Sequence, residues 1–258
     1  MRFSVITVTF NSGERLGETI NNVLAQKYDD FEIIIKDGRS TDHSLKNLPL
    51  TEKITLRVDE DNGIYDAMNQ AVEMSKGDYL IFMNAGDRFY DENVLQKISD
   101  VIDANPDRGI YYGDTYFRPT KSVVSMPSEI TPGICYRHLP CHQSCVFARS
   151  LYDDGGFDLK YRIRADYEFF LRNYFVKNVK PCYVHTVIAD YEGGGYSATH
   201  LELDNKEHKE ITEKYFTKNQ LFGQRMFAIF TLQSLRKKLA YSEKYKSKYD
   251  KMKKMVQK

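Results

Sequence analysis

The chain has 258 residues, and its 37 Lys and Arg nearly balance its 36 Asp and Glu, so the net charge is +1 at neutral pH. That balance lacks the basic excess of nucleic-acid-binding domains, and we expect no nucleic-acid partner. No apolar stretch reaches the roughly 18 residues that cross a bilayer. We expect no signal peptide, because Met1-Arg2 runs directly into a predicted strand. The four cysteines fit no zinc-binding spacing, so we expect reduced, buried thiols and a cytoplasmic location.

Positive charge gathers at the C-terminal end. From Leu232 onward, ten Lys and Arg stand against Glu243 and Asp250, so the rest of the chain carries a net charge of −7. The tail Leu201–Lys258 is helical in composition and increasingly basic. Such an asymmetry predicts a C-terminal segment with a role of its own.

Segments rich in β-branched and apolar residues alternate with segments of helical periodicity over roughly the first 85 residues. The expected strands are Phe3–Thr9, Phe31–Lys36, Ile54–Val58 and Tyr79–Met83. The expected helices are Arg15–Gln26, a short one after Asp42 that ends near Pro49, and Ile64–Ser75. This alternation predicts a parallel sheet with right-handed crossovers. The sequence contains neither a Gly-rich dinucleotide fingerprint after the first strand nor a P-loop.

The pattern changes after a further predicted helix at Asn93–Ala104. A hairpin is expected from Ile110–Phe117 and Ser122–Met126, followed by an irregular region from Pro127 to Pro140. The remaining expected elements are a strand at Ser144–Ala148, a helix at Arg164–Val176, a strand at Tyr183–Ala189 and a flexible loop at Gly193–Gly195.

The turn Asn84-Ala85-Gly86-Asp87 follows the apolar run Tyr79–Met83, which has the length and flanks of a buried central strand. Ligands of open α/β sheets bind outside the carboxyl ends of the strands. Hard divalent cations take oxygen ligands and commonly bridge a carboxylate to phosphate groups. We therefore expect Asp87, on an exposed turn, to hold a metal that binds a diphosphate. A solvated turn without a ligand is the alternative.

Several motifs occur in a fixed order along the chain. They are Ser4–Asn11 (SVITVTFN), Asp37–Asp42 (DGRSTD), Asp61-Asn62-Gly63 with Asn69, Gly77-Asp78-Tyr79, and Asn84–Asp87. Over residues 3–200 the chain resembles the glycosyltransferase family 2 enzymes with the GT-A fold, and most of all the bacterial transferases of exopolysaccharide, capsule and lipopolysaccharide sugars. The resemblance implies an α/β fold with a Rossmann-like, mostly parallel sheet flanked by helices and a small antiparallel second sheet.

The resemblance also implies a division of the chain. A GT-A domain at 1–200 would hold a nucleotide-sugar half at about 1–105 and an acceptor half at about 106–200. A basic helical extension would follow at 201–258.

Site residues follow from the matching motif positions. The resemblance implies that Asp37 accepts a hydrogen bond from the nucleobase and that Asp87 binds Mn²⁺ or Mg²⁺. It also implies that the donor pocket is lined by Thr9, Asn11, Asn62, Gly63, Asp66, Asn69, Asn84 and Ala85. This chain departs from the family pattern where Asn84 and Gly86 replace acidic residues and where Met68 replaces a common Arg.

Asp166 resembles the catalytic base of the family, which takes the proton of the acceptor hydroxyl. A helix cap is the alternative role for Asp166, and Glu168 is the competing base. His142 and Gln143 match positions on the acceptor and diphosphate side, and a structural role is the alternative for His142. His185 is a candidate third metal ligand, with a structural role in its strand as the simpler interpretation.

These inferences describe a metal-assisted, inverting transferase that moves a hexosyl or N-acetylhexosaminyl group. The donor would be a nucleotide diphospho-sugar, expected to be UDP-linked, and the acceptor a hydroxyl on a growing, lipid-linked surface glycan. The alternatives are a sugar nucleotidyltransferase, whose Gly-rich basic loop this chain lacks, and a non-catalytic nucleotide-sugar-binding module.

The stretch Gln220–Leu239 has a broad apolar helical face and leads into Lys- and Tyr-rich sequence. This pattern predicts a peripheral helix on the anionic inner face of the cell membrane. A helix that packs on its own domain, a homodimeric coiled coil and a solvated basic tail are the alternatives.

Overall fold

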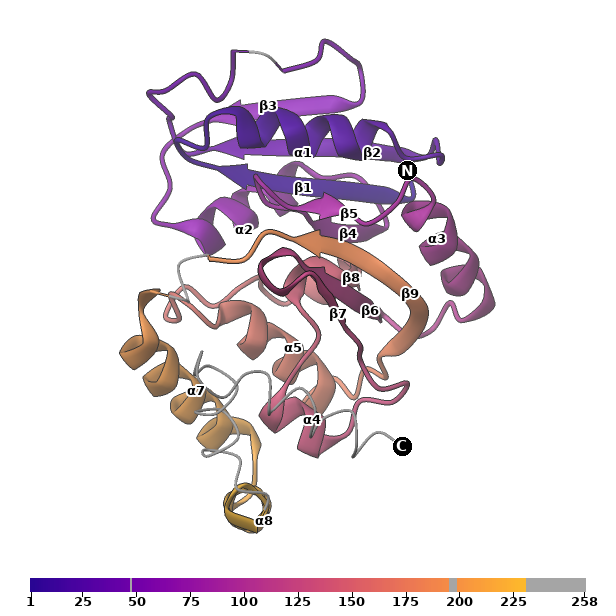
Figure 1. Cartoon of the computed structure of the whole chain (residues 1–258). Coiled ribbons are helices and arrows are strands. Elements are labelled where there is room, and N and C mark those ends of the chain that lie inside the picture. The colour runs from indigo at the N-terminus through magenta and orange to yellow at the C-terminus, as the bar shows by residue number, and fades with distance from the viewer. Residues whose placement is uncertain (47, 195–198, 231–258) are drawn as a thin grey trace. The chain divides into compact units, whose positions relative to one another are not determined.

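The computed structural model describes residues 1–46, 48–194 and 199–230 (Figure 1). The chain divides into two compact units, Met1–His208 and a second unit that begins at Lys209. The sheet and all the candidate site residues belong to the first unit. No helix in the described part of the chain is long and apolar enough to cross a membrane.

The elements alternate as follows. The strands are β1 Phe3–Thr9, β2 Phe31–Asp37, β3 Ile54–Val58, β4 Tyr79–Phe82, β5 Arg88–Phe89, β6 Ile110–Phe117, β7 Ser122–Val124, β8 Cys145–Ala148 and β9 Cys182–Tyr191. The α-helices are α1 Glu14–Leu24, α2 Ile64–Met74, α3 Val94–Ala104, α4 Pro132–Arg137, α5 Ala165–Phe175, α7 Leu201–Tyr215 and α8 Lys218–Phe230. Short 3₁₀ turns lie at Arg118–Thr120, His142–Ser144 and Arg149–Tyr152.

Within the described residues the strands form one nine-stranded sheet in the order β3-β2-β1-β4-β8-β6-β9-β5, with β7 paired to β6. The first four strands of that order are parallel, and Phe3 pairs with Phe31 on one side and Tyr79 on the other. β8 runs antiparallel to both β4 and β6. The strands expected to form a second, antiparallel sheet therefore belong to the same sheet as the parallel strands, and the β4–β8 pair joins the two groups.

Both faces of the parallel part are covered, which explains why β1 and β2 are apolar along their whole length. Every residue of both strands is buried. On one face, Leu16, Ile20 and Val23 of α1 pack with side chains of α3 against the odd-numbered residues of β1 and β2. α2 packs on β1 and β2 as well, and Figure 1 shows α1 lying across these strands.

The predicted fold class is confirmed, and the parallel β-α-β units lie within one or two residues of their expected bounds. The prediction of a short helix after Asp42 is wrong, because Ser44–Lys46 forms a turn. The reason is that Asp42 accepts hydrogen bonds from the backbone N–H groups of Ser44 and Gly13, which ties this segment to the start of α1.

The region expected to be irregular, Pro127 to Pro140, contains α4. Its start has a recognisable signal, because the Thr131 side chain accepts a hydrogen bond from the Ile134 N–H and Pro132 occupies the first turn. β5 has only two residues, too few for a periodic sequence pattern. The loop expected at Gly193–Gly195 lies partly outside the described residues.

Candidate active site

The carboxyl ends of β1, β2 and β4 meet at one edge of the sheet. The Thr7 hydroxyl donates to the Met83 carbonyl at 2.8 Å, and the Gly38 N–H donates to the Thr9 carbonyl at 3.0 Å. These bonds bring the turns that follow the three strands together, as expected for a ligand site in an open α/β sheet. Two parts of this edge differ in their polar chemistry.

The first part lies after β1 and β2 and contains Asp37. Its side chain is fully buried, and both carboxylate oxygens accept hydrogen bonds from Ser40, one from the N–H at 2.7 Å and one from the hydroxyl at 2.5 Å. Asn11 accepts a hydrogen bond from the Thr41 N–H, and the hydroxyls of Thr9 and Ser12 lie 2.6 Å apart. This part of the edge is therefore held together by its own side chains.

The loop directly before α1 has two backbone N–H groups that are already bonded. The N–H groups of Ser12 and Gly13 donate to the Ser44 hydroxyl at 2.9 and 2.8 Å, and the Gly13 N–H also reaches Asp42. These bonds tie the loop before α1 to the loop after β2.

A buried lysine organises the acidic turn after β3. The Lys36 side chain is inaccessible to solvent, and its ammonium donates to the carbonyls of Asp37 and Asp59 and to the carboxylate of Asp61, at 3.1, 2.6 and 3.0 Å. Its three protons thus have three acceptors. The Asp61 carboxylate also lies beside Gly38, so the turn and the Asp37 loop form one assembly.

Phe10 is a candidate site residue that the sequence alone did not single out. Its side chain is 64% exposed although it follows a completely buried strand, and its ring lies beside Gly38. An exposed aromatic ring next to a buried carboxylate is a suitable surface for stacking a base. The signal in the sequence was an aromatic residue directly after a strand of aliphatic and hydroxyl side chains.

The predicted donor residues on α2 are mostly engaged with one another. Asp66 accepts hydrogen bonds from the Asn62 N–H and the Gln70 side chain, and the Gly63 N–H donates to Asp61. Asn69 uses its carbonyl on the Phe157 N–H and its amide on the Phe157 carbonyl. Asn69 therefore fixes the loop around Phe157, with both groups of its side-chain amide occupied.

The second part of the edge contains Asp87. The prediction that this residue lies on an exposed turn is wrong. Asp87 is only 5% exposed, because α1 and the segment after β9 pack around the turn. Its carboxylate accepts hydrogen bonds from the Gln143 side chain at 2.9 Å and the Glu192 N–H at 3.1 Å. Burial raises the pKa of Asp87 to about 6, and these two hydrogen bonds oppose the shift.

The position before Asp87 accepts only glycine. Gly86 has φ +105°, and a Cβ at this residue would overlap the carboxylate of Glu192. That carboxylate also pairs with Arg15 of α1 at 3.1 Å, and the Arg15 side chain lies next to Gly86. Arg15, which is half exposed, therefore places a cation beside the Asp87 turn.

Two buried polar atoms in this second part have no hydrogen-bond partner among the described residues. They are the side-chain oxygen of Asn84 and the Nε2 atom of His142. The imidazole of His142 packs against the Phe82 ring, with centroids 4.8 Å apart, and burial lowers the pKa of His142. Unpaired buried polar atoms are costly in a folded protein, and these two lie on the same side of the edge as Asp87, where water or a ligand can supply the partner.

Asp166 lies in the first turn of α5. Its Oδ1 atom accepts hydrogen bonds from the Tyr65 hydroxyl at 2.8 Å and from the Tyr167 N–H at 2.8 Å. Among the described residues Oδ2 takes no hydrogen bond, so one oxygen is held and the other is available. The competing Glu168 is 1% exposed and lies beside Arg172.

The expected metal residue and the expected base lie in one electrostatic neighbourhood. Burial raises the pKa of Cys141 to about 12, and the carboxylates of Asp87 and Asp166 add to the shift. Burial likewise raises the pKa of Tyr191 to about 12, again with contributions from both carboxylates. Residues 79 positions apart in sequence therefore act on the same two side chains.

The described residues contain no cluster of three or more His, Cys, Asp and Glu side chains that could hold a metal by themselves. What the second part offers is an acidic oxygen of Asp87 and the unpartnered amide oxygen of Asn84. This oxygen-only set suits Mg²⁺ or Mn²⁺ shared with substrate phosphates and water. His185, the candidate third ligand, is exposed with φ +58° where the β6–β9 register shifts.

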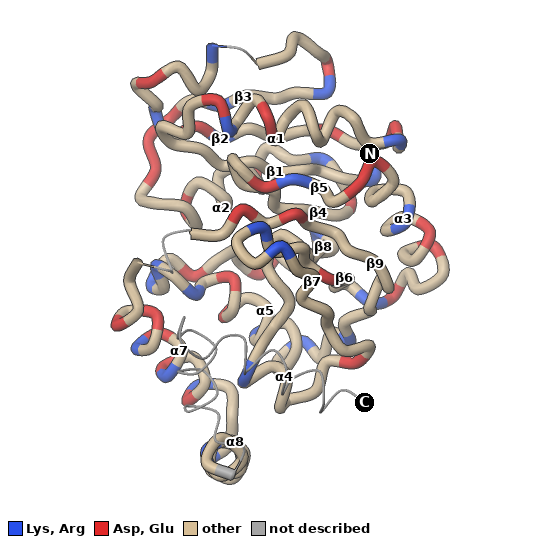
Figure 2. Tube along the Cα trace, in the orientation of Figure 1, with Lys and Arg blue, Asp and Glu red and all other residues tan. Residues whose placement is uncertain are grey.

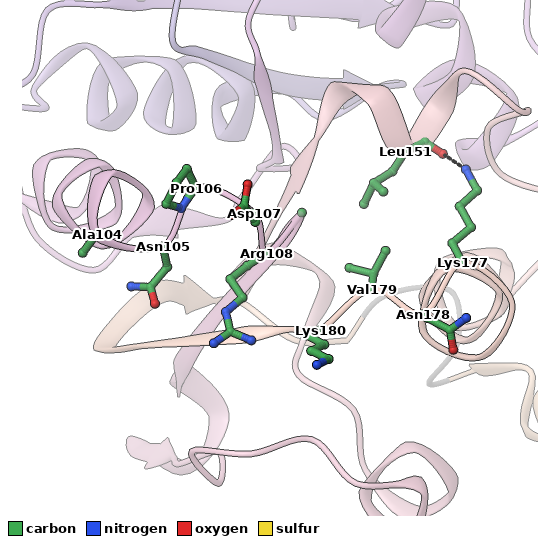
Figure 3. A pocket seen from close by; sticks show the side chains of 11 residues that line it. Ala104, Asn105, Pro106, Asp107, Arg108, Leu151, Lys177, Asn178, Val179 and Lys180 are labelled. Carbon is green, nitrogen blue, oxygen red and sulfur yellow. Dashed lines mark hydrogen bonds between the residues drawn. The ribbon is translucent and has the colours of Figure 1, made fainter.

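A cavity of about 660 Å³ lies at the amino ends of β6 and β9 (Figure 3), whereas the candidate site lies at the carboxyl ends of β1, β2 and β4. Arg108, Lys177 and Lys180 are among its lining residues, and the Lys177 ammonium donates to the Leu151 carbonyl at 3.1 Å. The C-terminal ends of α3 and α5 border it, and such ends disfavour anions. None of the predicted site residues lines this cavity.

Comparisons with known proteins show the family of the chain. The sequence profile of the family Glycosyl transferase family 2 matches residues 4–137, about half of the chain. A PGL/p-HBAD biosynthesis glycosyltransferase of Mycobacterium tuberculosis is 32% identical over 209 residues, covering 78% of this chain and 81% of that protein. TuaG of Bacillus subtilis, a glycosyltransferase named for teichuronic acid biosynthesis, is 30% identical over 105 residues, covering 39% of this chain and 42% of that protein.

Solved structures share the fold. Residues 1–349 of S. aureus TarS, in complex with UDP-GlcNAc, superpose with a TM-score of 0.63 at 19% identity over 76% of this chain. The chain spans 59% of that TarS structure. The mannosyltransferase PcManGT from Pyrobaculum calidifontis, in complex with GDP-Man and Mn²⁺, gives a TM-score of 0.63 at 16% identity over 96% of this chain and 83% of that chain.

The family match covers β1, β2 and β4, whose ends build the candidate site, and the relative from Mycobacterium tuberculosis matches 78% of the chain. The fold is the GT-A fold. The chain belongs to glycosyltransferase family 2 and is an enzyme that transfers a sugar from a nucleotide sugar to an acceptor.

Proposed function

We propose that this enzyme transfers a hexosyl or N-acetylhexosaminyl group with inversion, from a UDP-linked donor to a hydroxyl of a growing surface glycan. The observation that carries the proposal is a series of contacts that joins Asp87 to Asp166. Gln143 donates to Asp87, the ring of the neighbouring His142 packs on Phe157, and Tyr65 packs on Phe157 and donates to Asp166. A diphosphate at Asp87 would then lie near an acceptor activated at Asp166. A single displacement between the two inverts the anomeric centre.

Asp166 is the general base in this proposal. Its Oδ1 atom is fixed by Tyr65 and the Tyr167 N–H, which leaves Oδ2 to take the proton of the attacking hydroxyl. Glu168 is a poorer candidate, because it is almost inaccessible and lies beside Arg172. NMR of the product anomer tests the stereochemistry, and retention of configuration would contradict a single displacement.

The nucleoside half of the donor would occupy the first part of the edge. Asp37 would accept a hydrogen bond from a pyrimidine N–H, Phe10 would stack on the base, and Thr9 and Asn11 would line the pocket. The support is the burial of Asp37 beside an exposed aromatic ring. TarS was solved with UDP-GlcNAc and PcManGT with GDP-Man, so the choice of UDP needs a direct test.

The diphosphate would occupy the second part of the edge. Asp87 and Asn84 would hold Mg²⁺ or Mn²⁺, and the unpartnered Asn84 oxygen supports this set. A bound divalent cation would neutralise the charge that develops on the leaving diphosphate. Arg15, next to Gly86, would supply the phosphate-facing cation that Met68 does not provide.

Assays with UDP-, GDP- and dTDP-sugars test the function. The expected result is transfer or slow donor hydrolysis with UDP-sugars, enhanced by Mn²⁺. Sugar-nucleotide formation from a nucleoside triphosphate and a sugar phosphate would indicate the nucleotidyltransferase alternative. Tight UDP-sugar binding without turnover on any acceptor or water would indicate a binding module.

The acceptor side is supported by the names of two relatives, which refer to PGL/p-HBAD and teichuronic acid biosynthesis. A lipid-linked acceptor would bring the enzyme to a membrane surface. α8 exposes Phe222 and Ile229 at 65% and 64%, whereas the basic residues after Thr231 lie outside the described residues.

Flotation with anionic and neutral liposomes tests membrane association. Equal recovery of the full chain and of a chain ending at Thr217, with no effect of salt, would contradict it, and a dimer by light scattering would favour the coiled coil.

A further inference from the structure

The segment just before the catalytic helix is held by a single buried carboxylate. The backbone N–H groups of Arg162, Ile163 and Arg164 all donate to Glu207, at 2.8, 3.0 and 2.9 Å. Glu207 belongs to α7 and is only 5% exposed. Three consecutive N–H groups that converge on one anion form a concave anion site, and in this chain the protein fills that site with its own side chain.

The same segment is held from the opposite side by α2. The Tyr65 hydroxyl lies 2.6 Å from the Ile163 carbonyl and 2.8 Å from Oδ1 of Asp166. Tyr65 is 8% exposed, and the charge of Glu207 adds to the burial that raises its pKa. The single proton of this hydroxyl is shared between two acceptors, so Tyr65 on α2 holds the Ile163 carbonyl and Asp166 together, while the Ile163 N–H is bonded to Glu207 on α7.

A second contact attaches α7 to this segment. Arg164 pairs with Asp204 at 2.7 Å, one turn before Glu207. Charged residues of both signs follow one another along α7 (Figure 2), but most are exposed and contribute little. Glu207 differs from them because its carboxylate is buried and takes three charge-assisted hydrogen bonds.

We propose that Glu207 is a positioning residue for Asp166. It fixes residues 162–164 and thereby sets the position of the Asp166 carboxylate in the first turn of α5. This inference rests on the proposed role of Asp166 as the base. Asp166 follows Arg164 by two residues, so a shift of the segment moves the carboxylate directly. One buried residue of α7 then supports the catalytic carboxylate, although the sequence of this helix is rich in charge and resembles a solvated extension.

Glu207→Gln is the main test, because it keeps the size and removes the charge and one acceptor. We expect kcat to fall by up to about 100-fold, the cost of a small misplacement of a reacting group. The affinity for UDP, measured by calorimetry, should stay within about two-fold, because the donor contacts are untouched. Glu202→Gln, an exposed change on the same helix, is the matched control and should leave kcat unchanged.

Two further variants separate positioning from folding. Tyr65→Phe removes the hydroxyl that contacts both the Ile163 carbonyl and Oδ1 of Asp166, and its loss in kcat should be non-additive with that of Glu207→Gln. In an Asp166→Asn background, Glu207→Gln should cause no further loss, since it acts through Asp166.

The outcomes are distinct. Unchanged kcat in Glu207→Gln overturns the inference, and so does a parallel loss of kcat, UDP affinity and Tm, which indicates a general structural role. Full activity of Asp166→Asn overturns the proposed function itself.

Discussion

The two parts of the active-site edge differ in how their polar groups are satisfied. After β1 and β2, Asp37 is bonded to Ser40, and the buried ammonium of Lys36 has three acceptors. After β4, the Asn84 oxygen and His142 Nε2 are buried without partners among the described residues, and burial raises the pKa of Asp87 to about 6. In the proposed function, the first part would be a preformed frame for the nucleoside, and the second part would gain the partners of its unpaired groups from the diphosphate and its metal.

This contrast matches the chemistry each part has to perform. Binding a base needs a rigid pocket with a few correctly placed groups. Stabilising a leaving group needs polar or charged groups that have no partner within the protein and that interact with the charge developing on the leaving group during the reaction. A change of the base Asp166 should therefore reduce turnover, whereas changes at Asp37 and around the Asp87 turn should mainly alter the binding of donor and metal.

The largest effect is expected at the base. Asp166→Asn should lower kcat by ~10²–10⁴, the usual contribution of general-base catalysis, with UDP affinity nearly unchanged. Single-turnover kinetics with saturating donor would separate the two quantities. A collapse of donor binding with normal turnover of bound donor would make Asp166 a structural cap and remove the contrast between the two parts.

The next effect concerns Asp87 and its partner Gln143. We expect Mn²⁺ to raise the melting temperature only when UDP is present, because the described residues supply few ligands of their own. Gln143→Leu should weaken this Mn²⁺-dependent binding about 10- to 100-fold, as is typical when a hydrogen-bonded partner of a ligand is removed. Asp87→Asn should abolish it.

Gln143→Leu has a useful control in Cys141. The Cys141 thiol donates to the other end of the Gln143 amide at 2.9 Å, so Cys141→Ser keeps a donor and should preserve the Mn²⁺ effect. An unchanged Mn²⁺ dependence in Asp87→Asn would falsify the metal assignment.

A smaller effect is expected at Asp37. Asp37→Ala should weaken UDP binding by roughly 1–3 kcal/mol, the cost of leaving a buried partner unpaired. Ser40→Ala sharpens the comparison, because Ser40 now occupies both oxygens of the carboxylate. If Ser40 competes with the base, its removal should leave UDP affinity equal or higher, as measured by calorimetry. Equal UDP affinity in Asp37→Ala would place the nucleoside elsewhere.

The two parts also differ in how far the sequence could predict them. The parallel strands were predictable because a buried strand needs apolar residues on both faces, as Phe3–Thr9 shows over its full length. Asp37 follows such a strand directly, so its place at the edge was predictable too. Its bonding to Ser40 was not, since the loop that carries Ser40 has no periodic pattern.

In the second part the sequence could indicate residues but not their surroundings. Asp87 is buried because segments far away in sequence, at Gln143 and Glu192, cover the turn. Tyr65 reaches Asp166 across 101 residues, a contact that only the folded chain defines. In the sequence, Arg15 is only one charged residue of a predicted helix. Its position beside Gly86 depends on the positive φ of that glycine.

The smallest effect is expected at the pair Arg15–Glu192. Both side chains are partly exposed, so Arg15→Ala should weaken UDP binding by only about 0.2–1 kcal/mol, the usual range for exposed charge pairs. Binding of uridine, which lacks phosphates, should not change, because Arg15 would contact only the diphosphate. Glu192→Gln should act in the opposite direction, since it releases Arg15 and removes a negative charge next to Gly86. Calorimetry at low and high salt measures both ligands. An equal loss for uridine and UDP in Arg15→Ala would show that Arg15 supports the fold of this edge and does not bind phosphate.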